Sequence, residues 1–284
     1  DPDLQALAAA HAVVNVWDDH EVEDNYAGSQ PDSASTDPEN LENDNKTPRR
    51  VPYLERRKNG YKAFFEAMPR MRYKGDKNRI YGSVRLGGLA ELFLTDQRQY
   101  RDLQPCNDVL LAGCADSDNP ARTMLGADQK AWFKNAVPAS DAKWKLWGSE
   151  VMLMSLDLPA NNHVNQDAWD GYGAERREIL EHFVSTGVEN LATLVGDIHT
   201  FFAGDLTTNG QASGTPVGVE LVGGSLTSLG IPESLGVSAD SITALGIPAN
   251  PHIKFFDLKN RGYAVATIGK NEMTAEFRTC DTQT

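Results

Sequence analysis

Two short acidic stretches carry the residues in this sequence that are best suited to chemistry. The first is Asp18-Asp19-His20-Glu21, which directly follows the apolar run at residues 14–17. Adjacent carboxylates disfavour each other's ionisation unless a cation lies between them, and a metal ion is the simplest such cation. A solvated acidic loop at the surface is the other explanation of an Asp-Asp pair. The stretch therefore indicates either a metal site or a charged surface loop.

The second stretch repeats this arrangement far along the chain. Residues 191–195 form an apolar run, Gly196 permits a tight exit from it, and Asp197 and His199 follow on alternate positions. In an extended backbone, residues two apart point in the same direction, so Asp197 and His199 are predicted to face one centre. Carboxylates favour hard cations such as calcium, whereas imidazole also admits iron or zinc. Two such stretches in one acidic chain favour a metal cluster.

A series of motifs along the chain carries a resemblance to a known family. The first is Trp17-Asp18-Asp19-His20-Glu21, followed by Asn25 and Tyr26-Ala27-Gly28. The others are Ala67-Met68-Pro69-Arg70, the segment 94–101, Leu125-Gly126 with Gln129 and Trp132, Trp169 with Gly171-Tyr172 and Arg176, the segment 196–199, and Asn250-Pro251-His252. In their types and order these motifs resemble those of PhoD-type alkaline phosphatases, a branch of the calcineurin-like metallophosphoesterases. The resemblance covers nearly the whole chain.

The resemblance implies an enzyme that hydrolyses phosphate esters by in-line attack of a metal-bound oxygen nucleophile. His20 is then expected to contact the phosphate or to protonate the leaving group. The metals that the family implies are calcium and ferric iron, with zinc the weaker candidate. The expected metal ligands are Asp18, Asp19, Asn25, Asp197 and His199.

Further residues are expected near the substrate. Arg98 suits a catalytic contact with phosphate, because a guanidinium holds two oxygens at once, but an ion pair with Asp96 or a neighbouring carboxylate is the alternative. Trp169 and Tyr172 are expected to wall the substrate pocket, with packing inside their own loop as the alternative. The resemblance also implies that Asn250 and His252, next to the last strands, approach the site.

Two other functions remain open at this point. A phosphodiesterase, similar to a phospholipase D and acting on lipid, nucleic acid or teichoic acid, is the second candidate, and no feature of the sequence separates it from a phosphomonoesterase. A non-catalytic acidic calcium-binding module is the third. Two histidines beside the carboxylates argue against such a module, and the presence of redox-active iron would exclude it.

The elements that position these residues are expected to form an α/β fold. The resemblance implies a metallophosphoesterase sandwich of two mixed β-sheets flanked by helices, to which residues 1–284 contribute the C-terminal portion of a PhoD-like domain. Residues 230–250, rich in Gly, Pro and Ser, are expected to be irregular. The sequence patterns predict strands at 12–17, 80–84, 89–94, 144–156, 216–222, 253–256, 262–268 and 273–278, and helices at 4–12, 53–68, 126–137 and 174–185.

One motif of the family has no counterpart in this sequence. Family members carry a Gly-Asp-Tyr type motif on the first metal-binding strand, together with an additional cysteine ligand. Here Gly75-Asp76 is followed by Lys77, and Gly204-Asp205 is followed by Leu206. We therefore expect that the N-terminal portion of the same enzyme, as another chain, a cleaved piece or a part outside this sequence, supplies the first metal-binding strand.

The charge balance limits the binding partners. The chain has 27 basic and 40 acidic side chains among 284 residues, a formal net charge of -13. Stable binding to nucleic acid or to an anionic membrane depends on basic clusters, so we expect neither. The expected partner is a phosphate-ester substrate.

The cysteines suggest where the protein works. Cys106 and Cys114 flank a short loop that contains Asn, Asp and Gly, a spacing that suits a local disulfide in a secreted protein. Reduced, buried cysteines are the alternative. Cys280 is left over and has no obvious partner in the sequence. A secreted, periplasmic or extracellular location is therefore expected.

Overall fold

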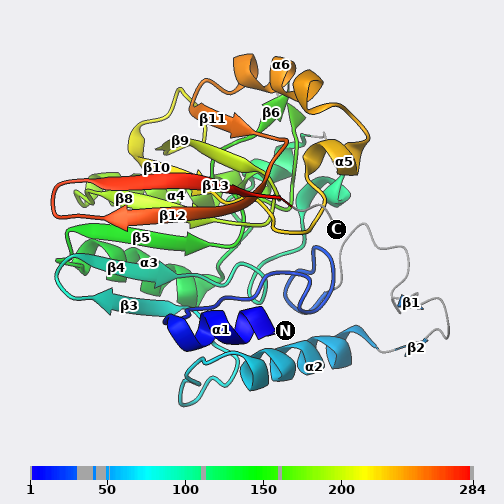
Figure 1. The fold of residues 1–284 in the computed structure, drawn as a ribbon, viewed down its shortest axis with the longest axis vertical. Helices are drawn as coiled ribbons and strands as arrows, with labels where there is room; N and C mark the ends of the chain where they lie inside the picture. Colours follow the sequence, from blue (N-terminus) through cyan, green and yellow to red (C-terminus); the bar gives the residue numbers. More distant parts are fainter. Residues whose placement is uncertain are drawn as a thin grey trace.

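The centre of the fold is a mixed seven-stranded β-sheet. The computed structural model describes residues 2–30, 41–42, 49–50, 52–109, 113–158 and 162–281. Helices cover one face of the sheet, and a β-hairpin lies over the other (Figure 1). The strands, in spatial order, are β11 (Ile253–Asp257), β9 (Phe201–Thr207), β10 (Pro216–Val222), β8 (Leu191–Val195), β5 (Trp144–Ser149), β4 (Ala90–Leu94) and β3 (Gly82–Leu86).

Four neighbouring strands of this sheet run in parallel. Strand β4 pairs with β5, β5 with β8, and β8 with β10, all in the same direction. Strands β3 and β9 are antiparallel to their neighbours β4 and β10. The carboxyl ends of the parallel strands, Leu94, Ser149, Val195 and Val222, therefore meet at one edge of the sheet. In open α/β sheets this edge is where ligands bind.

Two amphipathic helices build the main core against the sheet. Helix α3 (Ala127–Ala139) inserts Phe133, whose ring centroid lies 4.6 Å from that of Trp147 on β5. Helix α4 (Gly173–Ser185) adds Phe183, at 5.4 Å from Phe133. All three side chains are fully buried. The helices predicted at 126–137 and 174–185 are confirmed, apart from small shifts of their ends.

A hairpin supplies the second β layer. Strands β12 (Arg261–Ile268) and β13 (Met273–Cys280) pair antiparallel over their whole length. Ile268 and Met273, at the turn, pack onto a buried cluster on the sheet that includes Leu146. The indole Nε1 of Trp144 donates to the carbonyl oxygen of Gly269 at 2.8 Å, which fixes the turn to the sheet. Two β layers flanked by helices confirm the predicted fold class.

The segment at residues 12–17 is not a strand, which corrects the sequence-based prediction. Trp17 is fully buried and its ring stacks on Tyr61 of helix α2 (Tyr53–Ala67), with centroids 4.1 Å apart. Gly60 allows this close approach, because a Cβ there would lie 2.3 Å from the carbonyl oxygen of Glu21. The apolar run is therefore explained by burial of Trp17 against a helix and not by pairing in a sheet.

Two other regions differ from expectation. Strand β5 ends at Ser149, so only the first half of the predicted strand 144–156 is a strand in the structure. Residues 230–250 contain two helices, α5 (Ile231–Leu235) and α6 (Ala239–Ala249). Helix α5 begins where the carboxylate of Glu233 accepts a hydrogen bond from the backbone N–H of Gly230 at 3.1 Å. Pro232 thus lies at the beginning of a helix, and Pro248 lies near the end of the other, so neither residue interrupts a helix in its middle.

The remaining elements are short. Helix α1 (Pro2–Ala10) has no buried residue. In the part of the chain that the structure describes, none of the helices is both long enough and apolar enough to cross a bilayer. The short strands and single 3-10 turns are β1 (Leu41–Glu42), β2 (Arg49–Arg50), β6 (Asp157–Leu158), β7 (Asn162–His163), η1 (Pro105–Asp108), η2 (Ala115–Asp118) and η3 (Trp169–Tyr172).

A buried glutamate ties the segment after β5 to the sheet. Glu220 of β10 accepts hydrogen bonds from the backbone N–H groups of Leu153 and Met154, both at 3.0 Å, and from the hydroxyl of Thr193 at 3.1 Å. Burial raises the pKa of Glu220 to about 7, because these hydrogen bonds only partly offset its lost hydration.

This raised pKa makes the stability of the fold depend on pH. The contribution of Glu220 is fully present below the unfolded-state pKa of about 4.3 and is lost as pH rises towards 7. Glu220→Gln stays neutral at every pH and keeps an oxygen acceptor. We expect it to gain on the order of 2 kcal/mol of stability relative to wild type between pH 5 and pH 8, measured by calorimetric unfolding.

Glu181→Gln, on the exposed face of α4, is the control and should show no such trend. A pH-independent difference between wild type and Glu220→Gln would contradict the prediction.

Candidate metal centre

A cluster of three aspartates lies at the carboxyl edge of the parallel strands. Asp18, Asp19 and Asp197 each offer one carboxylate oxygen, and these oxygens lie within 4.8 Å of one another. Asp197 follows the end of β8 after Gly196, whereas the Asp18-Asp19 pair follows the buried Trp17. The structure thus brings the two acidic stretches of the sequence to one place.

Asp19 is held by a tight turn of its own segment. Its backbone carbonyl accepts hydrogen bonds from the N–H groups of Val22 and Glu23, both at 2.8 Å. Its carboxylate accepts from the N–H groups of His20 at 2.8 Å and Asn25 at 3.0 Å. Asp19 is only 5% exposed. These contacts fix the carboxylate before any ligand binds, a form of preorganisation.

Asn25 is positioned by a partner outside this turn. It has a left-handed backbone, with φ of 51°, a conformation that Asn tolerates better than most residues. Its side-chain Nδ2 donates to the carboxylate of Asp108 at 2.8 Å, which fixes the orientation of the amide. Asn25 lines the same cavity as the aspartate cluster.

The segment that carries Asp197 and His199 is a bend and not the extended backbone that the sequence suggested. Their φ angles are 65° and 57°, so the argument from alternating side chains does not apply. Asp197 joins the cluster, while His199 lies beside it on the cavity wall. The His199 Nδ1 is 2.8 Å from the carbonyl oxygen of Leu229. Because a carbonyl only accepts, Nδ1 carries the proton and Nε2 keeps the lone pair that a metal requires.

Arg98 lies beneath the cluster and has no exposed surface. Its guanidinium contacts the carboxylates of Asp18 at 2.6 Å, Asp167 at 2.7 Å and Asp197 at 3.4 Å. Asp96 accepts a hydrogen bond from the backbone N–H of Arg98 and not from its side chain. Of the two interpretations from sequence, the structure shows the ion pair with neighbouring carboxylates. Arg98 therefore holds the cluster together from below.

Asp167 is a central member of the site that no sequence pattern singled out. It is buried and contacts Arg98, Arg101 at 2.8 Å and the side-chain amide of Gln104 at 2.7 Å. Burial alone would raise the pKa of Asp167, but Arg101 and Arg98 bring it below the ordinary value. Its polar loop is visible in the sequence, but the contacts that give it a role come from segments far away in the chain.

The charges of this buried group do not balance. Its members are Asp18, Asp19, Asp167, Asp197, Arg98 and Arg101. Four carboxylates against two guanidinium groups leave two formal negative charges. Burial, partly offset by Arg98, raises the pKa of Asp18 to about 6, and burial together with Asp18 raises the pKa of Asp197 well above its ordinary value. A hard cation held by these oxygens would offset both effects, so the donor set fits such an ion.

A cavity of about 460 Å³ opens above the cluster. Its lining combines the cluster and nearby polar residues, which include His20, Asp24 and Asn25, with apolar side chains that we call the apolar side. His20 lies at the mouth with 73% of its side chain exposed, and its Nε2 is 3.6 Å from the carboxylate of Asp24. The apolar side consists of Val164, Ile198, Leu229, Ile231 and Leu235.

Trp169 and Tyr172 are not on the wall of this cavity. Trp169 is fully buried and its ring centroid lies 5.8 Å from that of Trp147. The Tyr172 hydroxyl donates to the carbonyl oxygen of Asp102 at 2.6 Å, and its ring lies under Arg101. The structure thus shows the packing alternative for both, because the loop turns its aromatic side chains inward towards the main core.

Asn250 and His252 also lie away from the cavity, contrary to expectation. Asn250 accepts a hydrogen bond from the backbone N–H of Asp157 at 2.8 Å, and His252 Nε2 is 2.8 Å from the carbonyl oxygen of Ser155. Burial lowers the pKa of His252. The reason is topological, since these residues precede β11, which β9 and β10 separate from β8. They border a second acidic group, formed by Asp157, His163 and Asp170.

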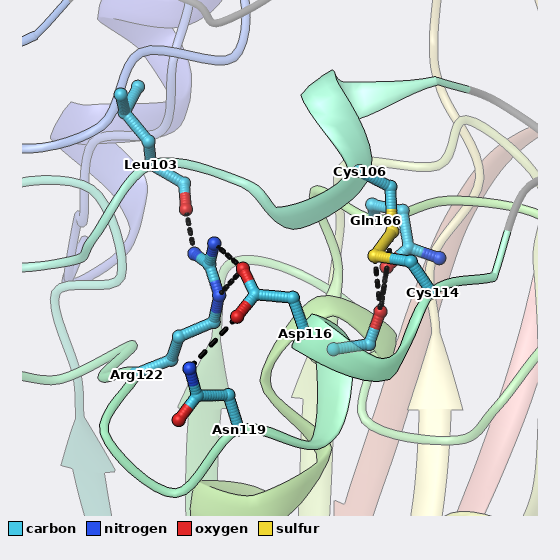
Figure 2. Close-up of a disulfide and its surroundings, with 8 residues drawn as sticks. Leu103, Cys106, Cys114, Asp116, Asn119, Arg122 and Gln166 are labelled. Carbon is cyan, nitrogen blue, oxygen red and sulfur yellow. Dashed lines mark hydrogen bonds and ion pairs between the residues drawn. A yellow bond between two sulfur atoms is a disulfide. The ribbon is translucent and has the colours of Figure 1, made fainter.

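The predicted disulfide is present, and Gln166 lies beside it (Figure 2). Cys106 and Cys114 are joined, with their Cα atoms 5.9 Å apart. Beside them, the Ser117 hydroxyl donates to the side chain of Gln166 at 2.7 Å, and Gln166 immediately precedes Asp167. Asp108, which accepts from Asn25, belongs to the bridged loop. The disulfide therefore braces two segments that contact the cluster.

The comparisons with known proteins show the family of the chain. The family model for PhoD-like phosphatase matches residues 1–277. The chain belongs to the PhoD-like phosphatase family. The family predicted from the motifs is thereby confirmed.

Two PhoD relatives resemble the chain over nearly its full length. Alkaline phosphatase D of Bacillus subtilis (strain 168) is 32% identical over 285 residues, which cover 98% of this chain and 46% of that protein. A solved structure of PhoD matches with a TM-score of 0.76 and 29% identity, covering 96% of this chain and 51% of that chain. The chain thus spans about half the length of these PhoD relatives.

A purple acid phosphatase from yellow lupin seeds (Lupinus luteus) gives a TM-score of 0.40 at 9% identity, over 74% of this chain and 32% of that chain, which is too low to bear on the fold.

The ion pairs of Arg98 predict a large effect of its removal from this PhoD-like chain. Arg98→Met leaves three carboxylates without their shared counter-charge in a buried site. We expect the free energy of unfolding to fall by about 3–5 kcal/mol, measured by urea denaturation in metal-free buffer. Arg85→Met removes a surface arginine that pairs with Glu91 and Asp141, and it should leave the midpoint almost unchanged. Similar midpoints for the two variants would contradict the role of Arg98.

Proposed function

We propose that this chain carries catalytic residues of a metal-dependent phosphoric ester hydrolase, an alkaline phosphatase that acts on phosphate monoesters. The observation that carries the proposal is the cluster of Asp18, Asp19 and Asp197 at the floor of a cavity, in a member of the PhoD-like phosphatase family. The Bacillus subtilis relative is named an alkaline phosphatase. The chain spans about half the length of its PhoD relatives, so the activity proposed is that of the whole enzyme.

The metal ligands proposed are residues that line this cavity. The carboxylates of Asp18, Asp19 and Asp197 would hold the cation, with His199 Nε2 and the amide of Asn25 beside them. An all-oxygen group favours calcium, and the imidazole admits ferric iron, so we propose both ions, with zinc the weaker candidate. When bound, such cations polarise a phosphoryl oxygen and make a coordinated water more acidic.

His20 is proposed to protonate the oxygen of the leaving group. Its ring lies at the open mouth of the cavity, where a leaving group would depart towards solvent. Asp24, at 3.6 Å, orients the ring from the solvent side. A donor in this position spares the leaving group from departing as an unstable alkoxide.

Arg98 is proposed to act by positioning. Its guanidinium is enclosed by the carboxylates of Asp18, Asp167 and Asp197, so its N–H groups are directed at these side chains. It fixes two of the three ligand carboxylates relative to each other. The contribution of Arg98 therefore lies in geometry rather than in a contact with the phosphate.

A phosphodiesterase is the second candidate function. The apolar side of the cavity favours it, because a second substituent on the phosphate would find a surface there. A non-catalytic calcium-binding module, the third candidate, explains the carboxylates but gives no role to His20 at the mouth.

A secreted or periplasmic location is also proposed. The disulfide between Cys106 and Cys114 supports it, because such bonds persist in oxidising compartments. The net charge of -13 supports the absence of stable binding to nucleic acid or anionic membranes.

The ligand assignment predicts that loss of one carboxylate abolishes most turnover. We expect Asp197→Asn to lower the rate on p-nitrophenyl phosphate by about 100-fold or more, because a weakened cation site forfeits several kcal/mol of transition-state stabilisation. A strong chelator should lower the turnover of the native enzyme to the same degree, and addition of calcium with ferric iron should restore this turnover. Asp128→Asn, on the exposed start of α3, is the control. Turnover that resists the chelator would refute the proposal.

The role of His20 predicts a dependence on the leaving group. We expect His20→Asn to slow hydrolysis of an alkyl phosphate by about 10²–10⁴-fold, whereas p-nitrophenyl phosphate should lose far less, because p-nitrophenolate leaves without a proton. Steady-state kinetics on both esters measures the difference. His11→Asn, at an exposed position outside the cavity lining, should behave like wild type. Equal losses on the two esters would show that His20 is not the acid.

A further inference from the structure

A second cavity lies directly behind the apolar side of the metal cavity. It has a volume of about 190 Å³ and we name it the apolar chamber. Val164, Ile231 and Leu235 line both cavities and so form their common wall. The two spaces are therefore adjacent parts of one binding region, with carboxylates at one end and hydrocarbon at the other.

The lining of the chamber suits an apolar occupant. Phe202, Phe256 and Leu258 form its back, and among its described lining residues Ser241 alone has a polar side chain. The Ser241 hydroxyl is already paired with that of Ser238 at 2.7 Å. A water molecule needs two to four polar partners, and cavities of about 150 Å³ with this kind of lining stay dry and bind benzene. The chamber thus has the size and chemistry for an aromatic ring or a short alkyl chain.

The rim of the chamber exposes hydrocarbon to solvent. Leu235 is 39% exposed, Val237 is 44% exposed, and Leu229, on the metal side, is 58% exposed. All three come from the segment around α5. Apolar side chains gathered beside a polar site are typical of a surface that receives an apolar ligand group.

We propose that the apolar chamber is the subsite for an alkyl or aryl substituent of a phosphate ester whose phosphoryl group lies at the Asp18, Asp19 and Asp197 cluster. This proposal rests on the proposed function in its second form, the phosphodiesterase, and deepens it by naming the substrate class, an amphipathic phosphodiester whose other substituent leaves at the cavity mouth. In this arrangement the ester extends past Val164, Ile231 and Leu235, which line both cavities. Selection arises because each methylene that enters the chamber leaves water.

Helix α6 offers a position at which the chamber can be filled. Gly246 lines it, and a Cβ added there would meet Phe256 at 3.8 Å, an ordinary van der Waals contact. A larger side chain at Gly246 therefore occupies the chamber without a backbone clash. Gly88, between β3 and β4, has no atom within 4 Å of an added Cβ and gives a matched control far from both cavities.

The test uses the metal-loaded native enzyme and p-nitrophenyl phosphodiesters that carry methyl, ethyl, butyl, hexyl or phenyl groups. We expect kcat/KM to rise by about 3- to 4-fold per added methylene until the chamber is full. The phenyl ester should resemble the butyl ester. Gly246→Val should abolish the rise beyond the ethyl ester and keep the methyl ester within about 2-fold of wild type, whereas Gly88→Val should keep the full series.

A rate that does not change with chain length in the wild type would overturn the subsite. Equal losses on the methyl and hexyl esters in Gly246→Val would overturn it as well, since they would show a general defect of the site. Binding of methylphosphonate and hexylphosphonate, measured by calorimetry, separates the subsite from the reaction. If no ester is hydrolysed but hexylphosphonate binds more tightly to wild type than to Gly246→Val, the proposed function fails and the subsite stands.

Discussion

The candidate site depends on one buried guanidinium. Arg98 contacts carboxylates from three segments that are distant in the sequence, and it supplies the counter-charge that these carboxylates need where they are shielded from water. Arg98 and Arg101 leave part of the negative charge of the group uncompensated. The same interaction thus assembles the site and makes it receptive to a cation. A fully neutralised cluster would be more stable without metal but would have little affinity for one.

The acidic stretches are positioned by different means. Asp197 follows a central parallel strand, so the register of the sheet fixes where it lies. The Asp18-Asp19 pair has no strand before it and depends on Trp17, which is anchored against α2, and on the turn that closes after Asp19. One aspartate of the cluster therefore depends on the sheet, and the other two depend on an aromatic contact with a helix. Loosening α2 would displace Asp18 and Asp19 without disturbing the sheet.

These differences explain how much the sequence could predict. Apolar runs bounded by Gly or by polar residues located the central strands well, because a strand buried on both faces is read in the sequence as a nearly continuous apolar run. The same kind of run at 12–17 misled, since burial of Trp17 by a helix gives the same pattern as burial in a sheet. The acidic motifs marked Asp18, Asp19 and Asp197, but Asp167 gains its role only from contacts across the fold. The extended backbone inferred for Asp197 and His199 was wrong because both have positive φ, although both residues line the metal cavity.

The apolar side of the metal cavity links selection of the ester to the electrostatics of the cluster. Ile198 and Leu229 line the cavity together with the carboxylates, and their side chains occupy space that water would otherwise fill. Charge interactions are stronger in such surroundings, which is also why burial dominates the raised pKa of Asp18 and Asp197. A change on this side would alter both the affinity for a cation and the fit of the ester. Gly246 lines the chamber behind the common wall, so a change there alters only the fit of the ester substituent. Substitutions at this position therefore vary the chamber without changing the cluster.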